Sequence, residues 1–425
     1  MNRTIIIGLD GIPYSLLKKY ISNGIMPETG KVLSGGKLYE ITSTLPEISS
    51  VSWATIITGK NPSEHGVYGF TALAPQSYVL RFPNFDSLKK PAFWLKDDYT
   101  PDESKKYAII NTPFTFPAKP INGIHIAGFV ALDLEKAIYP TKLYAQLAEI
   151  GYKIDVDSSK AHQSIELFLK DLDGTLDKRI SAAKMIWERE AWDVFMLVFT
   201  GTDRLSHFLF QAALDENHPF HEKVIDHFRK IDAYIGELCA QCDSSDTIAF
   251  MSDHGFEVQE YEAFVNFYLK EWGYLKLKND PPRSYNDIDE GTIAFAMDPG
   301  RIYLNYKDRY PRGRVDESHA DKIVKELSDR FMHCIIEDRP VISEIFEGKE
   351  ISKGEFAVYA PDLVLIGARG IDLKGTIKAQ TVYNKNEIFG GKHTYRDTFF
   401  GVKMPPGASY PSVRSVEDIK AALNL

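Results

Sequence analysis

The sequence predicts an α/β fold in which a mostly parallel central sheet carries helices on both faces. Short apolar segments that end in polar residues recur between helical stretches, at residues 3–9, 107–111, 193–200 and 246–252. Strands that alternate with helices favour a parallel sheet covered on both faces. Ligands of such sheets bind outside the carboxyl ends of the strands. Asp10, Asp203 and Asp253 fall at or just after three of these ends and are therefore candidate site residues.

The first unit along the chain is a strand followed by a helix. Residues 3–9 form an apolar, β-branched run bounded by Asp10, which is typical of a buried strand that ends in a turn. Apolar residues then recur with helical spacing as far as Ile21, and Gly24 and Pro27 are expected to end that helix. Asp10 is thus expected at the C-terminal tip of the strand.

Two segments interrupt the alternation of strands and helices. Residues 72–104 and 256–389 are richer in Pro, Asn, Asp and charged residues and lack a regular pattern. We interpret the first as a small insertion and the second as an insertion or cap. The remaining core is expected to comprise residues 1–255 and 390–425.

The composition is that of an ordinary globular protein with a sizeable core, since 44% of the 425 residues are apolar and 26% are charged. The net charge of -9 argues against a nucleic-acid or anionic-membrane partner. No apolar run approaches the roughly 20 residues that span a bilayer, and Asp10 interrupts the N-terminal apolar run, unlike a signal peptide. We expect a cytoplasmic protein.

Two motifs with ligand-like spacing are interpreted as structural. Cys239 and Cys242 have the spacing of a redox motif, but they end an expected helix and no second pair completes a zinc site. With Cys334 they are too few for a disulfide framework, which fits a reducing compartment. His218 and His221 are separated by a proline in a polar stretch, which indicates an exposed loop.

Asp203 and His207 stand four residues apart, directly after an apolar strand. Residues at this spacing share one face of a helix, so a carboxylate and an imidazole there can hold one metal ion. In isolation, a capping Asp with a surface His explains the pair better.

Two later motifs add histidines. Asp253 and His254 are adjacent at a strand tip, so they point in different directions and can serve two neighbouring ions, while Gly255 permits the tight turn. A simple polar turn is the alternative. His393 follows Gly390-Gly391-Lys392, in which the backbone can approach an ion or phosphate closely, although a flexible connection has the same composition.

A serine cluster opens the helix that Gly59 is expected to end. Ser49 is expected at or near the N-cap, where the helix dipole and free N–H groups favour a bound phosphate. An N-cap with no catalytic role is the alternative.

Taken together and in this order, the motifs resemble the alkaline phosphatase superfamily, specifically its type I phosphodiesterase and nucleotide pyrophosphatase branch. The resemblance covers about residues 4–70 and 193–255 and the segment around His393. The pattern comprises a strand ending at Asp10, Ser49 placed nine residues before Thr58-Gly59, the Asp203/His207 pair, Asp253-His254-Gly255 and the late His393. It implies an alkaline phosphatase-like catalytic core with cap insertions.

The resemblance also implies two divalent metal ions. One would be held by Asp10, Ser49, Asp253 and His254, and the other by Asp203, His207 and His393. The family metal is typically zinc, with manganese as an alternative, and zinc suits mixed imidazole and carboxylate ligands.

The implied activity is hydrolysis of small-molecule phosphate diesters, as a phosphodiesterase or nucleotide pyrophosphatase. Metal coordination would activate the Ser49 hydroxyl, which would attack phosphorus and form a phosphoseryl-type intermediate that water then hydrolyses. The branch usually has threonine at this position, whereas alkaline phosphatases themselves use serine, so the choice between diester and monoester stays open.

Three alternatives remain beside this prediction. A phosphomonoesterase is the nearest, although such enzymes generally add an Arg, a Lys or a third metal that the sequence does not reveal. A sulfatase is disfavoured because Val51 and Trp53 stand where its motif needs Pro and Arg. A catalytically inactive phosphate-ligand binding protein is disfavoured because all six ligands other than Ser49 are present.

Overall fold

The protein is described by a computed structural model that covers residues 2–131, 133–385 and 388–425. Within these ranges the largest sheet has eight strands in the order β2-β21-β9-β1-β8-β5-β6-β7. The strands are β1 (Thr4–Leu9), β2 (Lys37–Ile41), β5 (Tyr107–Thr112), β6 (Gly123–Ala127), β7 (Ile138–Tyr139), β8 (Val194–Phe199), β9 (Thr247–Met251) and β21 (Thr398–Lys403). Strands β9, β1, β8, β5 and β6 are parallel, and the edges are antiparallel. The predicted α/β fold with a mostly parallel sheet is confirmed.

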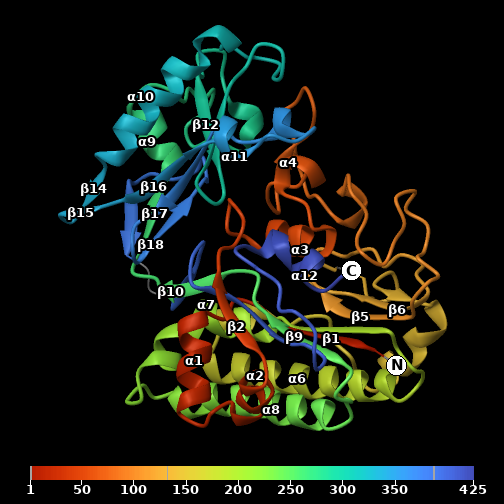
Figure 1. Ribbon diagram of the computed structural model, residues 1–425. Helices are drawn as coiled ribbons and strands as arrows, with labels where there is room; N and C mark the ends of the chain where they lie inside the picture. The colour runs from red at the N-terminus through yellow and green to blue at the C-terminus, as the bar shows by residue number, and fades with distance from the viewer. Residues whose placement is uncertain (1, 132, 386–387) are drawn as a thin grey trace.

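Helices cover both faces of this sheet (Figure 1). One face carries α1 (Tyr14–Ser22), α2 (Pro27–Ser34), α6 (Ile165–Trp187) and α8 (His221–Cys239), and the other carries α3 (Ser49–Thr58) and α12 (Ile419–Ala422). Side chains of β1 alternate between two hydrophobic cores, because Ile5 and Ile7 pack on one side and Ile6 on the other. In the described ranges no helix combines the length and apolarity needed to cross a membrane.

The chain segment between β10 (Gly255–Val258) and β20 (Gly391–Thr394) forms a second part of the structure, at the top of Figure 1. The two flanking strands pair with each other as an antiparallel ribbon. The second part contains a four-stranded and a three-stranded sheet with a hydrophobic cluster of its own. Its elements are β11 (Tyr261–Phe264), α9 (Val265–Glu271), β12 (Ala294–Met297), β13 (Arg301–Leu304), α10 (Ala320–Met332), β16 (Ile342–Glu347), β17 (Leu363–Gly367), β18 (Ile371–Lys374) and β19 (Tyr383–Lys385). We propose a core of residues 1–255 and 390–425 and a cap of residues 256–389, because their hydrophobic clusters are separate.

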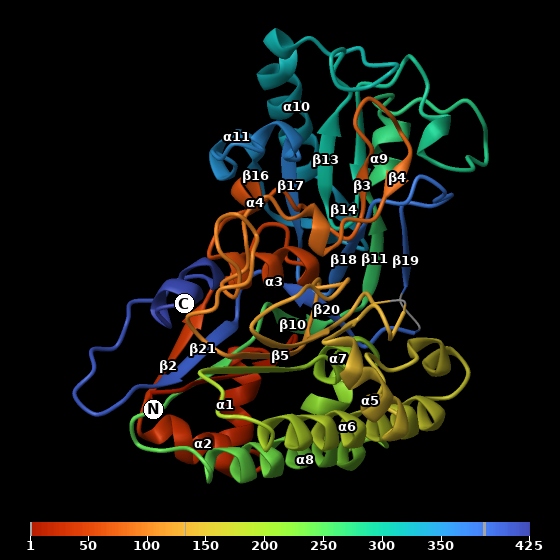
Figure 2. The same ribbon diagram turned by 90° about the vertical axis from the view of Figure 1, so that its right-hand side faces the viewer.

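The small insertion expected at residues 72–104 also contributes to this cap. Its hairpin, β3 (Ala72–Leu73) with β4 (Leu80–Arg81), lies beside the strands of the cap (Figure 2). Tyr78 is 2% exposed and donates a hydrogen bond to Oδ1 of Asn305 at 2.7 Å. Its ring stacks on Tyr310 with centroids 5.5 Å apart. An early part of the chain therefore stabilises the later one.

Replacing Tyr78 by alanine is expected to destabilise the protein by about 3–5 kcal/mol, because a buried aromatic ring and its hydrogen bond are lost. Chemical denaturation followed by fluorescence measures the change. Val79→Ala is the matched control, since Val79 is 51% exposed and its loss should cost less than about 0.5 kcal/mol. Equal destabilisation by both variants would contradict the assigned packing.

Candidate functional site

Three neighbouring strands bring three aspartates together. Asp10 directly follows β1, Asp253 lies just after β9, and Asp203 lies in the first turn of α7 (Gly201–Leu214), which follows β8. Because β1 pairs in parallel with both β8 and β9, the carboxyl ends of all three strands share one edge of the sheet. Each of these aspartates is at most 3% exposed.

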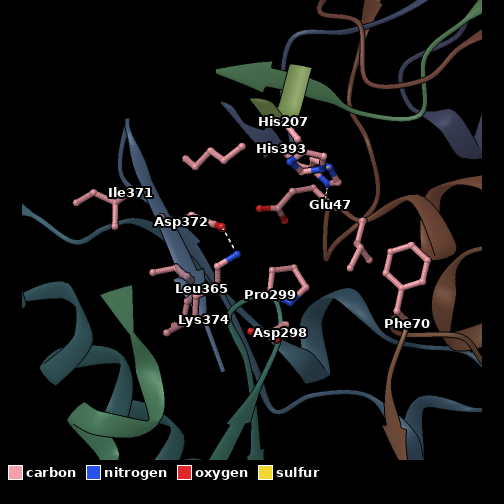
Figure 3. A pocket seen from close by; sticks show the side chains of 14 residues that line it. Glu47, Phe70, His207, Asp298, Pro299, Leu365, Ile371, Asp372, Lys374 and His393 are labelled. Carbon is pink, nitrogen blue, oxygen red and sulfur yellow. Dashed lines mark hydrogen bonds and ion pairs between the residues drawn. The ribbon is translucent and has the colours of Figure 1, made fainter. Parts of the chain in front are cut away.

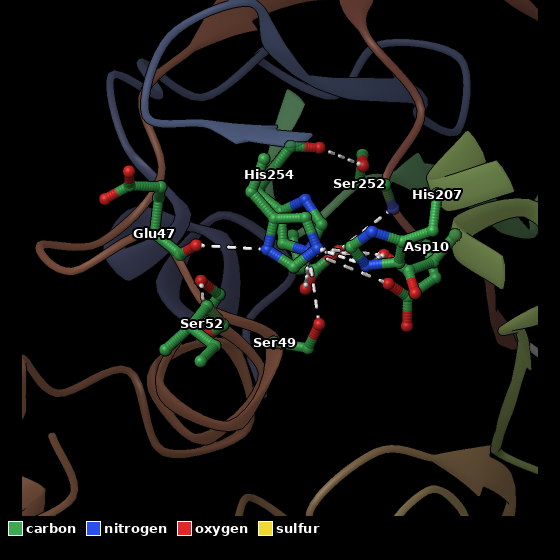
Figure 4. A network of polar contacts seen from close by, with 12 residues as sticks. Asp10, Glu47, Ser49, Ser52, His207, Ser252 and His254 are labelled. Carbon is green, nitrogen blue, oxygen red and sulfur yellow. Dashed lines mark hydrogen bonds and ion pairs between the residues drawn. The ribbon is translucent and has the colours of Figure 1, made fainter. Parts of the chain in front are cut away.

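Three histidines complete the cluster, as Figure 4 shows for His207 and His254. His207 lies one turn after Asp203 on α7. His254 precedes β10, and pairing of β20 with β10 sets His393 opposite Phe256, two residues after His254. The rings of His254 and His393 stack with centroids 3.6 Å apart. The structure thus brings all six expected ligands into one cluster.

One group of ligand atoms comes from Asp203, His207 and His393. Nε2 of His393 lies 3.1 Å from Oδ1 of Asp203 and 3.0 Å from Nε2 of His207. Nε2 of His207 lies 3.6 Å from Oδ1 of Asp203. Two imidazole nitrogens and a carboxylate oxygen that converge in this way can hold one cation.

A second group comes from Asp10, Asp203 and His254, whose ligand atoms lie within 4.8 Å of one another. Nε2 of His254 is 3.9 Å from Oδ1 of Asp10, 3.9 Å from Oδ1 of Asp203 and 3.3 Å from Oδ2 of Asp253. Oδ1 of Asp203 therefore faces both groups, a shared position that the sequence did not predict.

Each aspartate uses one oxygen to bind a donor of the chain. Oδ2 of Asp10 accepts a hydrogen bond from Nε1 of Trp53 at 3.1 Å. Oδ1 of Asp253 accepts one from the Gly11 amide at 3.2 Å, and Arg204 donates to Oδ2 of Asp203 at 2.9 Å. These contacts leave the other oxygen of each carboxylate directed at the cluster. Sequence reasoning missed Trp53 and Arg204 as supporting residues, although each lies within four residues of a named motif.

Two of the remaining carboxylate oxygens lack a hydrogen-bond partner within the described residues. Oδ1 of Asp10 and Oδ2 of Asp253 are buried and accept no hydrogen bond within the part of the chain that the structure describes. Burial, and then the charge of Asp203, raise the pKa of Asp253 to about 7. Burial, together with the charges of Asp253 and Asp203, raises the pKa of Asp10. A bound cation would satisfy these oxygens, so the residues present fit a metal.

The histidines direct their Nε2 atoms at the same cluster of ligand atoms. Nδ1 of His254 lies 3.1 Å from its neighbouring carbonyl of Gly255, and Nδ1 of His393 lies 3.2 Å from the carbonyl of Glu47. Protons on these Nδ1 atoms leave Nε2 as the ligand atom in both rings. Burial lowers the pKa of His207 to about 4, which keeps this ring neutral and able to bind a metal.

Ser49 is the first residue of α3 and is 6% exposed. Its Oγ lies 3.1 Å from Nε2 of His254 (Figure 4). The N-cap is Ile48, so Ser49 lies next to the N-cap, in agreement with the expected position at or near it. Among the described residues, no backbone carbonyl accepts from the amides of Ser49 or Ser50. Free amides at a helix N-terminus favour a bound phosphoryl group.

The other two serines of this segment face elsewhere. Oγ of Ser52 lies 3.0 Å from Oγ of Ser43 and 2.9 Å from Oγ1 of Thr44. Oγ of Ser50 is buried and has no hydrogen-bond partner within the described residues. Among these three serines, Ser49 is the one whose hydroxyl contacts a candidate metal ligand.

The histidine and cysteine pairs interpreted as structural flank α8: His218 lies just before it and His221 begins it, whereas Cys239 ends it and Cys242 lies just after it. Cys239 and Cys242 are free thiols, and burial raises their pKa values to about 12 and about 11. Thiols with raised pKa values are poor nucleophiles and poor metal ligands at neutral pH. Nδ1 of His221 is 2.7 Å from the carbonyl of Ala212.

The chain is similar to one family of known proteins. The model of a family described as "Type I phosphodiesterase / nucleotide pyrophosphatase" matches residues 4–396. A search of curated protein sequences gave no match.

Solved structures share the fold. A phosphonoacetate hydrolase from Sinorhizobium meliloti 1021 in complex with phosphonoformate superposes with a TM-score of 0.66 at 16% identity, covering 100% of this chain and 95% of that one. Murine ectonucleotide pyrophosphatase/phosphodiesterase 5, in an inactive form with AMP, gives 0.57 at 11% identity over 100% and 96%. The human protein gives 0.56 at 12% identity over 100% and 95%.

Trp53→Phe is expected to lower the affinity for zinc or manganese about 10- to 100-fold, because the hydrogen bond that orients Asp10 is lost. Calorimetric titration of the metal-free protein measures the affinity. Trp94→Phe is the matched control: Trp94 is as buried as Trp53, but its Nε1 has no hydrogen-bond partner within the described residues. A similar loss of affinity in both variants would show that core packing, not the hydrogen bond, is responsible.

Chelation of metal is expected to lower the melting temperature more at about pH 8.5 than at about pH 6.5. A carboxyl with a folded-state pKa above its unfolded value of about 3.9 stabilises the fold at low pH, and this contribution is lost as the pH rises through the folded-state pKa. For Asp253 that value is about 7, and Asp10 shifts in the same direction. Scanning calorimetry with and without EDTA tests this. Asp253→Asn should weaken the pH dependence, and an unchanged dependence would refute the assignment.

Proposed function

Because the chain belongs to the type I phosphodiesterase and nucleotide pyrophosphatase family, and is therefore a phosphoester hydrolase, we propose that it cleaves small-molecule phosphate diesters through a covalent intermediate on Ser49. The observation that carries the proposal is the position of Ser49. Its Oγ lies 3.1 Å from His254, at the N-terminus of α3 and at the edge of the carboxylate and histidine cluster.

The family is metal-dependent, and the donor set supports two divalent cations, zinc by preference or manganese. Asp10, Asp253, His254 and Ser49 would hold one, and Asp203, His207 and His393 the other. When bound, such ions lower the pKa of a serine hydroxyl and neutralise charge on phosphoryl oxygens.

Residues of the chain position the Ser49 hydroxyl and supply hydrogen-bond donors for the phosphoryl group. Oγ of Ser49 lies beside Nε2 of His254, so both atoms can face the same ion, and the free amides of Ser49 and Ser50 can donate to a phosphoryl oxygen as negative charge develops on it. A bond forms between Oγ and phosphorus while the bond to the leaving alcohol breaks, and that alcohol takes a proton. Water then cleaves the bond between Oγ and phosphorus, and the Ser49 hydroxyl regains its proton.

The charges around the site support a diester, which carries one negative charge, over a monoester, which carries up to two. The cationic side chains near the cluster and the adjoining cavity all have carboxylate partners. Arg204 pairs with Asp203, Lys374 with Asp372 and Lys392 with Glu257. Within the described residues these cations are therefore engaged, and a second phosphoryl charge has no dedicated partner.

A phosphomonoesterase is the second candidate, because position 49 is a serine and Arg204 lies 2.9 Å from Asp203. Arg204 would then have to turn from Asp203 toward the substrate. Since its guanidinium also bonds Asp155 at 2.9 Å and lies 3.9 Å from the ring centroid of Phe129, the observed position favours support of Asp203.

Metal-loaded protein is expected to hydrolyse bis-p-nitrophenyl phosphate faster than p-nitrophenyl phosphate. Ser49→Ala should lower kcat at least about 10³-fold, because the nucleophile is lost. Release of p-nitrophenol measures both rates. Ser50→Ala is the matched control, since its hydroxyl contacts no partner within the described residues.

The outcomes separate the candidates. A preference for the monoester would favour the phosphomonoesterase. Activity that survives in Ser49→Ala, or that falls equally in Ser50→Ala, would exclude Ser49 as the nucleophile.

A further inference from the structure

A cavity of about 240 Å³ adjoins the candidate metal ligands His207 and His393 (Figure 3). One wall is the segment that leads into α3, with Glu47 and Ile48, and the opposite wall belongs to the cap. A phosphoryl group bound at Ser49 would direct its organic substituent into this space. The volume is below the roughly 300–1,000 Å³ of pockets for drug-sized ligands, so a short substituent fits best.

Glu47 points its carboxylate into this cavity (Figure 3). The residue is 8% exposed, and its backbone carbonyl lies 3.2 Å from Nδ1 of His393, which fixes it relative to the cluster. Within the described residues no side chain donates a hydrogen bond to this carboxylate or pairs with it, and the donor beside it is its own amide. A buried carboxylate without a side-chain hydrogen-bond donor costs free energy, and a ligand that supplies a donor lowers this cost.

The cations that line the cavity are already used. Nζ of Lys374 is 2.5 Å from Oδ2 of Asp372, and Nζ of Lys392 is 3.0 Å from Oε1 of Glu257. Asp298, on the cap wall, accepts a hydrogen bond from the Gly375 amide. In the described part of the chain neither Glu47 nor Asp298 lies within ion-pair distance of a cationic side chain, although the charges of Lys392 and Lys374 act on them from farther away. The cavity therefore keeps two carboxylates without a direct cationic partner, the buried Glu47 and the exposed Asp298.

The neighbouring cluster does not offset this charge. Two divalent cations would balance the carboxylates of Asp10, Asp203 and Asp253 together with one phosphodiester charge. The cavity therefore stays negative when substrate is bound, and it would repel a second anionic group. A hydroxyl could donate a hydrogen bond but would leave the buried carboxylate of Glu47 without a direct cationic partner, whereas an ammonium supplies both donors and charge.

We propose that this cavity binds a short ammonium-bearing substituent of the phosphoryl substrate, held between Glu47 and Asp298. The inference rests on the proposed function, because it assigns the organic part of the substrate cleaved at Ser49. It makes the enzyme selective for aminoalkyl phosphoesters over neutral and acidic ones of the same length.

The test is calorimetric binding of 2-aminoethylphosphonate and propylphosphonate to the metal-loaded protein. The two ligands have equally long substituents and no ester bond, so the measurement does not depend on turnover. The amine is expected to bind at least about tenfold more tightly, which is about 1.4 kcal/mol. 2-Hydroxyethylphosphonate should resemble propylphosphonate, and 3-phosphonopropionate should bind more weakly than both.

Substitutions test which residues cause the preference for the amine ligand. Glu47→Gln keeps the shape of the side chain and should remove most of the preference for the amine, while the affinity for propylphosphonate changes little. Asp298→Asn, on the other wall, should also reduce the preference and serves if Glu47→Gln fails to fold. Glu344→Gln is the matched control, because Glu344 pairs with Arg396 and lies outside the cavity. It should leave the preference unchanged.

The inference is overturned if the amine and propyl ligands bind equally, if the hydroxyl ligand matches the amine, if neither Glu47→Gln nor Asp298→Asn changes the ratio, or if no phosphonate binds. Hydrolysis of bis-p-nitrophenyl phosphate by the same preparation tells whether the proposed function fails as well. Intact hydrolysis with no preference for the amine would reject only the assigned substituent.

Discussion

The mutual repulsion of three buried carboxylates governs this structure. Asp10, Asp203 and Asp253 meet at one edge of the sheet, where burial and like charge raise the pKa values of Asp10 and Asp253. Donors from Trp53, Gly11 and Arg204 stabilise one oxygen of each, but the opposite oxygens of Asp10 and Asp253 accept no hydrogen bond within the described residues. In the proposed function, cations bind between the three aspartates and offset their repulsion, with the histidines as the remaining ligands.

The ribbon of β10 and β20 joins this cluster to the cap. It begins beside His254 and carries His393, so the strand that returns from the cap also supplies a candidate ligand. The Nδ1 side of the His393 ring faces the carbonyl of Glu47 and its Nε2 faces Asp203. Through this contact Glu47, which lines the cavity, is fixed next to the cluster. In the proposed substrate selection, the substituent therefore binds beside the reacting groups without moving them.

Much of the fold followed from local patterns. The alternation of apolar strands with helices predicts a parallel sheet, and the three aspartates fall at its carboxyl edge because each ends or follows an apolar run. The spacing of Asp203 and His207 places both on one face of α7. His393 could be connected with them only through the resemblance to a known family, since a glycine-rich loop by itself indicates no partner. The contribution of Tyr78 to the cap was not predicted, because its partner Asn305 is remote in the chain.

Local sequence patterns are sufficient to place particular residue types at strand ends and helix starts, because backbone periodicity and turn chemistry act over a few residues. The sequence therefore specified the class of fold and the candidate ligands Asp10, Asp203 and Asp253. Contacts in three dimensions establish which oxygens of Asp10 and Asp253 lack a hydrogen-bond partner within the described residues, and that Ser49 and not Ser52 contacts His254. They also establish that Glu47 faces a cavity whose lysines pair with other carboxylates. These properties depend on distances between segments far apart in the chain. Buried charges interact strongly and buried polar atoms need hydrogen-bond partners, so these distances decide the energy of the site, and no local pattern encodes them.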